Sequence, residues 1–117
     1  MAVVALDTDD RLRQQLDDLV ATMCRAINDP KRLLLLYALR ESPRSVGELS
    51  AMLGLPQSNT SQHLAVLRDR GLLGTDRQGN NVFYSLRYPK LLDAIDLLRE
   101  VMADEVDRQV SLHNPNV

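Results

Sequence analysis

Seven consecutive polar residues, Gln57 to His63, carry no formal charge apart from any on the histidine, and Leu64, Val66 and Leu67 follow them. A helix that begins this way can set its first turns against the base edges and phosphates of DNA while its later turns pack on a core. The positive end of the helix dipole would also face phosphate. The other interpretation is a solvated helix start, because Ser, Thr and Asn favour such positions in any helix.

Thiol and imidazole groups are scarce, since the chain has one Cys and two His. Cys24 lies at the edge of an apolar helical stripe, where it is either a small buried hydrophobic side chain or a single redox-active thiol. One cysteine cannot form an intrachain disulfide framework, so we expect a protein of the reducing cytoplasm. The N-terminus does not resemble a secretory signal, and no apolar run is long enough for a membrane span.

Charge is unevenly distributed along a chain whose net charge is −2. Residues 1–30 hold three Arg and six Asp, residues 31–90 hold nine Lys or Arg and four Asp or Glu, and residues 91–117 hold two Arg and six Asp or Glu. A basic middle between acidic ends is typical of a nucleic-acid footprint in a chain whose other parts have another task.

Two helices are predicted before the polar run. Apolar residues at helical spacing predict the first helix over residues 9–28. Asp29 and Pro30 then favour a new helix start, because Asp caps well and Pro suits the first helical position. The apolar run that follows should place this second helix in the core.

The polar run opens the second helix of a predicted helix-turn-helix, residues 45–71. Ser45 and Glu48 have the spacing of a capping box, and Gly54 is placed to end the helix that they start. The next helix is expected from Pro56 to Gly71 after only a short turn.

A change of period after this helix predicts a wing over residues 72–88. Polar and apolar residues alternate there around a turn at Gly79 and Asn80. A last helix should cover residues 89–109. We therefore expect residues 1–117 to form a single, mainly α, winged helix-turn-helix domain with about five helices and a β-hairpin.

Three stretches together resemble the ArsR/SmtB family of small dimeric winged-helix repressors. They are "AINDPKRLLLLYAL", "SVGELSAMLGLPQSNTSQHLAVLRDRGLL" and "RQGNNVFYSL", which cover roughly residues 20–88 in order. Pro56 stands where many members of the family have Ser. The resemblance and the polar run together give the predicted DNA contacts: Gln57, Ser58, Asn59, Ser61, Gln62, His63 and Arg68 in the helix, and Arg77 and Asn80 in the wing.

The family's usual effector sites are missing from the sequence. Members that sense metals carry paired cysteines in the third helix or histidines in the last, and this chain has neither. We expect no cofactor and no metal site. A stripe of carboxylates in the last helix should be a solvated face rather than a hard-cation site, because its members are parallel and do not converge. The stripe comprises Asp93, Asp96, Glu100, Asp104 and Asp107.

The leading hypothesis is a homodimeric, DNA-binding transcriptional repressor that recognises an inverted repeat. Its dimer should form through residues 9–28 and 89–109. In the last helix the expected apolar face is Leu91, Ile95, Leu98, Met102 and Val106. One alternative is a protein-interaction module that does not bind DNA, and another is a repressor that responds to thiols or persulfides through Cys24. An enzyme is not expected, because no catalytic set can be assembled.

Overall fold

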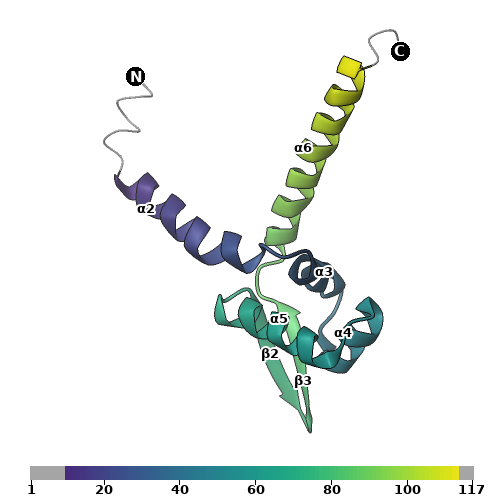
Figure 1. Ribbon diagram of the computed structural model, residues 1–117. Coiled ribbons are helices and arrows are strands. Elements are labelled where there is room, and N and C mark those ends of the chain that lie inside the picture. The colour runs from purple at the N-terminus through teal and green to yellow at the C-terminus, as the bar shows by residue number, and fades with distance from the viewer. Residues whose placement is uncertain (1–9, 114–117) are drawn as a thin grey trace. The chain divides into compact units, whose positions relative to one another are not determined.

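A computed structural model describes residues 10–113, which form two compact units, one up to Arg87 and one from Tyr88 onward. The second unit holds one helix, α6 (Lys90–His113). The elements of the first are α2 (Asp10–Asp18), the π-helical segment η1 (Leu19–Cys24), α3 (Pro30–Ala38), β1 (Arg44–Ser45), α4 (Val46–Leu53), α5 (Gln57–Asp69), β2 (Leu73–Gln78) and β3 (Asn81–Leu86) (Figure 1).

The predicted start of α3 and the predicted start and end of α4 are confirmed by their capping residues. The Asp29 carboxylate accepts a hydrogen bond from the Lys31 N–H at 2.7 Å, with Pro30 at the first helical position of α3. α4 begins with the expected capping box between Ser45 and Glu48, and Gly54 ends it with a left-handed φ of 65°. The caps are short-range effects, which is why the sequence alone predicts them well.

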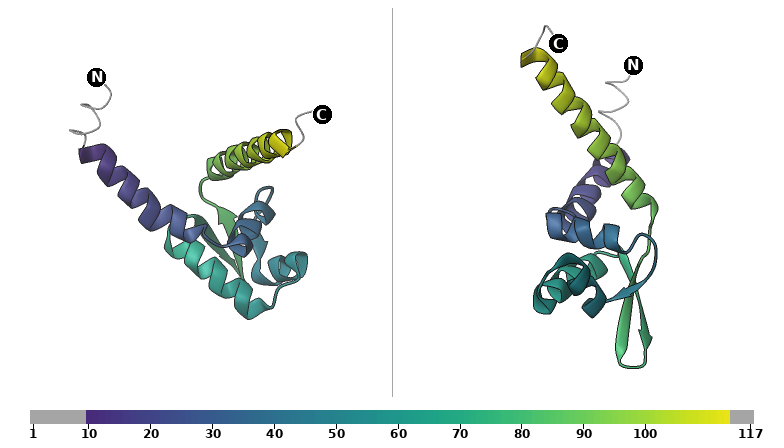
Figure 2. Two further views of the ribbon diagram at one scale, coloured as in Figure 1. Left: turned by 45° about the horizontal axis from the view of Figure 1, so that its top comes forward. Right: turned by 90° about the vertical axis from the view of Figure 1, so that its right-hand side faces the viewer.

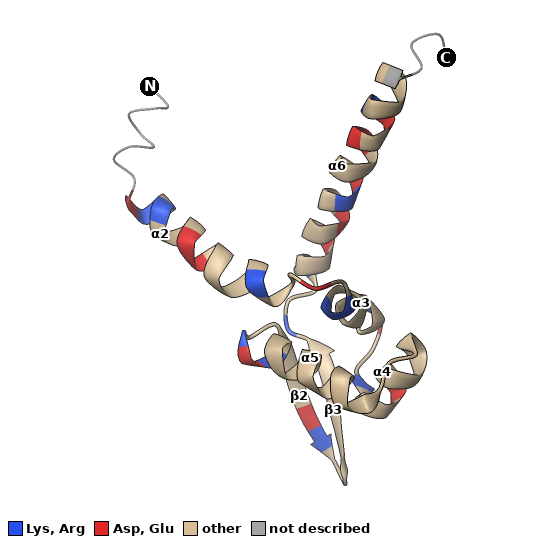
Figure 3. Cartoon of the chain, viewed as in Figure 1, with Lys and Arg blue, Asp and Glu red and all other residues tan. Residues whose placement is uncertain are grey.

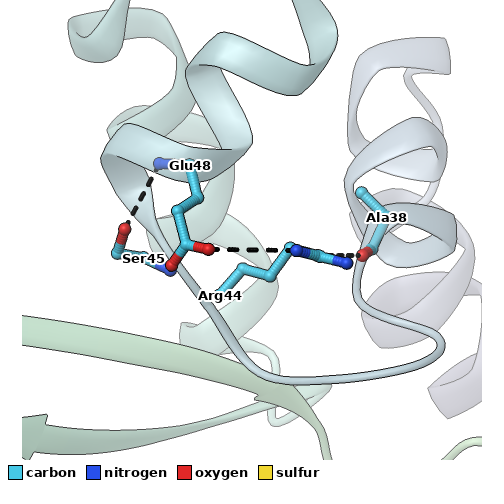
Figure 4. A network of polar contacts seen from close by, with 4 residues as sticks. All are labelled: Ala38, Arg44, Ser45 and Glu48. Atoms are coloured by element: carbon cyan, nitrogen blue, oxygen red, sulfur yellow. Dashed lines mark hydrogen bonds and ion pairs between the residues drawn. The ribbon is translucent and has the colours of Figure 1, made fainter.

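Glu48 also joins elements that the sequence did not connect. One of its carboxylate oxygens accepts from the Ser45 N–H at 3.2 Å, and the other lies 3.8 Å from Nη1 of Arg44. Arg44 in turn donates through Nε to the Ala38 carbonyl at the end of α3, at 3.1 Å (Figure 4). This network fixes the chain between α3 and α4.

Arg44 and Ser45, which directly precede α4, form a short strand, β1, which the sequence did not predict. Arg44 pairs with Tyr84, and Ser45 pairs with Phe83, so the sheet has the antiparallel order β1-β3-β2. A two-residue strand has no periodicity to detect. Its consequence is that the wing is anchored to the start of the helix-turn-helix.

The predicted wing is the hairpin of β2 and β3, paired from Leu73 with Leu86 to Gln78 with Asn81. Its turn consists of Gly79 and Asn80, of which only Gly79 has a positive φ, at 64°. Such a turn matches the right-handed twist of the strands and needs Gly at its first position. The hairpin extends beyond α3, α4 and α5 in Figure 1 and in the right-hand view of Figure 2.

The core of the first unit lies where α3, α4 and α5 contact one another and the base of the hairpin. α3 is apolar on most sides, as expected, and it buries Leu35 and Leu36 while Leu34 stays half exposed. The other buried apolar side chains of this unit are Ala26, Leu39, Leu49, Leu64, Leu67, Leu72, Leu73 and Tyr84.

The first helix was predicted as regular, but six of its residues are π-helical. Asp9, its predicted first residue, lies outside the described residues. At the end of this segment the N–H of Arg25, its C-cap, donates to the Thr22 carbonyl. The Ala21 carbonyl accepts a hydrogen bond from Nη1 of Arg70 at 2.7 Å. Irregular turns of this kind depend on tertiary contacts, so helical periodicity does not reveal them.

α6, considered by itself, continues to His113, four residues beyond its predicted end. Leu92 and Ile95 are buried, but large apolar side chains along the rest of the helix are more than half exposed. They are Leu97, Leu98, Val101, Met102, Val106, Val110 and Leu112. No helix within residues 10–113 combines the length and apolarity needed to cross a membrane.

The end of α4 provides a test of the fold. Gly54→Ala should lower the free energy of unfolding by about 1–2 kcal/mol, because a Cβ is strained in the left-handed conformation. Gly47→Ala is the matched control: its Cβ would lie 3.6 Å from the nearest side-chain atom, an ordinary contact. Urea unfolding should show the control to be neutral or slightly stabilising. Equal losses in both variants would contradict the assigned role of Gly54.

Candidate nucleic-acid interface

α5 divides the polar run between the core and the surface. Thr60, Leu64 and Leu67 are 0% exposed and share one face of the helix. The hydroxyl of Thr60 donates to the Pro56 carbonyl at 3.0 Å, so its burial leaves no unpaired oxygen. The predicted contacts Gln57, Ser58, Ser61 and Gln62 are exposed, while Asn59 and His63 are partly buried. The side chain omitted from the prediction, Thr60, is the one that faces the core.

The exposed start of α5 is uncharged and its first turn is open. Pro56 is the N-cap and makes no side-chain capping hydrogen bond, and no acidic residue lies in the first turn. The first backbone N–H groups therefore have no side-chain acceptor and can bind a phosphate oxygen. Charged residues occur only at the far end of the helix (Figure 3). This start fits close approach to a polyanion.

Arg68, at that far end, is exposed and lies on the same face as Ser61. Its guanidinium donates twice to the Asp69 carboxylate, at 3.2 and 3.1 Å. The pair is on the surface and therefore weak, so a phosphate could replace Asp69 at small cost.

The wing presents one cation away from its carboxylate. Asp76 and Gln78 lie on one face of β2 and are hydrogen-bonded at 3.1 Å. Arg77 lies between them in sequence and is exposed, so it points to the opposite face. Among residues 10–113 it forms no ion pair. A guanidinium in this setting is available for phosphate.

Two predicted contacts from distant parts of the sequence meet at one hollow. A cavity of about 360 Å³ is bounded by Gln57 at the start of α5 and Asn80 in the wing turn. Ser45, Val46, Gly47, Asn81, Val82 and Tyr84 complete its lining. These lining residues were not predicted as part of the site, because their place in it depends on the pairing of β1 with β3.

His63 touches a cluster that the sequence did not reveal. Its Nδ1 lies 3.4 Å from Nη1 of Arg32, which is 31 positions earlier in α3. The backbone N–H of Lys31 holds the pKa of the Asp29 carboxyl below its ordinary value, and the charge of Arg32 acts in the same direction. In the sequence, Arg32 belongs to the first of the three stretches that resemble the ArsR/SmtB family, and nothing there indicates a contact with His63.

Cys24 corrects one prediction, because it is exposed rather than buried. It is the last residue of η1, and the apolar side chains Leu16, Leu19 and Val20 of the same predicted helix are exposed as well. No group of three or more His, Cys, Asp and Glu within the described part of the chain could hold a metal ion. Of the predicted carboxylate stripe, Asp96 pairs with Arg99 at 3.3 Å.

Comparison with known proteins identifies relatives over most of the chain. Residues 29–74 match the model of the bacterial regulatory protein, arsR family. The chain is 42% identical over 82 residues to the HTH-type transcriptional regulator YgaV of Escherichia coli, covering 69% of this chain and 83% of that protein.

Two solved structures extend the likeness to the fold. The crystal structure of Rv0081 from M. tuberculosis matches with a TM-score of 0.71 and 36% identity, over 81% of this chain and 96% of that one. The transcriptional repressor BigR from Xylella fastidiosa matches with a TM-score of 0.68 and 32% identity, over 80% and 95%. The chain belongs to the ArsR family of bacterial regulatory proteins, and it is a winged helix-turn-helix transcriptional regulator.

Proposed function

We propose that this regulator is a cytoplasmic, homodimeric repressor that binds an inverted-repeat operator and catalyses no reaction. α5 enters the major groove, where Gln57, Ser58, Ser61, Gln62 and His63 contact bases and nearby phosphates. Asn59 and Arg68 complete the contacts of this helix, and Arg77 and Asn80 of the wing reach the flanking backbone or minor groove.

One observation carries the proposal: α5 is anchored through Thr60, Leu64 and Leu67, while the exposed residues of its first two turns are polar and uncharged. A face built to bind another protein would be expected to include aromatic or large apolar anchors. Short amides and hydroxyls suit base edges, which offer donors and acceptors in a fixed pattern. A protein-interaction module without DNA binding is therefore the less favoured alternative.

The dimer is supported by exposed apolar side chains that line one stripe in each of the two units. One comprises Leu16, Leu19 and Val20 of the first helix, and the other is the exposed part of α6. Apolar surface of this extent is unusual on a soluble monomer. A second copy of the chain is the occupant we assign to both, because a twofold dimer places two α5 helices against successive major grooves.

The first functional prediction separates reading from positioning. Gln62→Ala should lower the preference for operator over random DNA by about 1–3 kcal/mol, since a base contact is lost. Arg77→Ala should weaken binding to both DNAs alike and reduce the salt slope by about one, because one phosphate contact is lost. Fluorescence anisotropy over a salt series, on an operator obtained by in vitro selection, measures both quantities.

Gln14→Ala, a matched change at an exposed glutamine in α2, should leave both quantities unchanged. The proposed sequence-specific binding is contradicted if in vitro selection enriches no DNA sequence. The assigned roles of Gln62 and Arg77 are wrong if the two variants change operator preference and salt slope in the same way. A selected site should also be an inverted repeat with half-sites about one helical turn apart.

The second functional prediction concerns assembly. The parent should sediment as a dimer at micromolar concentration, and Leu98→Lys should sediment as a monomer, because a charge would be buried in the apolar interface. Asp104→Lys introduces the same side chain on the carboxylate face of α6 and should remain dimeric. A monomeric parent would overturn the proposal, and so would a dimeric Leu98→Lys variant.

A further inference from the structure

Arg32 is placed by three hydrogen bonds to different partners. Its Nε donates to the Ala26 carbonyl, and its Nη2 donates to the Arg25 carbonyl at 3.2 Å. Both carbonyls belong to the end of the first helix. These two contacts fix the plane of the guanidinium, and its remaining nitrogen, Nη1, lies 3.4 Å from Nδ1 of His63.

This contact determines where the imidazole carries its proton. A guanidinium has donors and no acceptor, so Nδ1 of His63 must be the acceptor. In the neutral ring the proton is then on Nε2. Nε2 lies on the other side of the ring and has no hydrogen-bond partner among residues 10–113. It is not among the described side-chain atoms that are both buried and without a partner, so it is open to solvent. The exposed edge of His63 is thus a defined donor on α5.

We propose that Arg32 is a positioning residue for DNA recognition, which holds His63 in the Nε2–H tautomer so that α5 presents a donor to an acceptor on DNA. This inference rests on the proposed function. The acceptor is a base-edge oxygen or nitrogen, or a phosphate oxygen, on the strand that α5 contacts. Asp29 is the other charged group near this cluster, and the charge of Arg32 is one of the causes that lower the pKa of its carboxyl group.

Arg70 provides a matched comparison. It too donates to a carbonyl of the first helix, that of Ala21 at 2.7 Å, but it does not touch His63. If Arg32 only holds the first helix, changing either arginine should have the same kind of effect. If Arg32 positions His63, only the change at Arg32 should alter the tautomer of His63 and lower the preference for operator over random DNA.

The first experiment reads the histidine directly, by ¹⁵N NMR of the free full-length protein at pH 8, where ordinary imidazoles are uncharged. His113→Gln assigns the signals, since the chain has two His. His63 should show an unprotonated Nδ1 and a protonated Nε2. Arg32→Met should move these shifts toward a tautomer average, whereas Arg70→Met should not. If Nδ1 of His63 carries the proton in the parent protein, the proposal is overturned by that result alone. It is also overturned if Arg32→Met leaves the ¹⁵N shifts of His63 unchanged.

The second experiment is a double-mutant cycle in DNA binding. His63→Ala and Arg32→Met should each lower the ratio of operator to random affinity by about tenfold, and the double variant should lose little more than either alone. Arg70→Met should leave the ratio unchanged. Independent, multiplying losses for Arg32 and His63 would show that Arg32 does not act through the histidine. Failure of selection to enrich any site would instead overturn the proposed function, while the NMR result would still report on the contact.

Discussion

The recognition helix works only if it is held firmly by one face while the other stays free. Three side chains of α5 meet the first requirement, Thr60, Leu64 and Leu67, all of them without exposed surface. The threonine belongs to this buried face although it lies inside a polar run, because its hydroxyl donates to the Pro56 carbonyl and so leaves no unpaired polar atom in the core. The rest of the fold can be understood as support for this helix.

A chain with a net charge of −2 can bind DNA because its charges are unevenly distributed along the sequence. The first turn of α5 holds no acidic residue, so a phosphate at that position would meet no carboxylate from it. In the wing, strand alternation directs Arg77 away from Asp76 even though the two are adjacent. The acidic residues of α6 lie in the other unit. Net charge is therefore a poor guide to function here, and local charge is a good one.

The sequence predicted what depends on neighbouring residues and missed what depends on distant ones. The caps at Asp29, Ser45 and Gly54 and the turn at Gly79 were all recoverable, since each involves residues within a few positions. β1, the π-helical segment and the Arg32 to His63 contact were not, because each needs a partner far along the chain. The DNA contacts themselves stay predictions, although α5 and the wing expose most of them.

The first helix and the reading helix are not independent parts. Arg32 connects the end of the first helix to the middle of α5, and Arg70 connects η1 to the end of α5. Both connections use guanidinium groups that donate to backbone carbonyls, which hold direction better than apolar contacts do because hydrogen bonds weaken steeply off axis. The carbonyl that Arg70 uses, that of Ala21, lies within η1. If the first helix forms the dimer interface, Arg32 thus connects that interface to the middle of the reading helix through directed polar contacts rather than through a flexible linker.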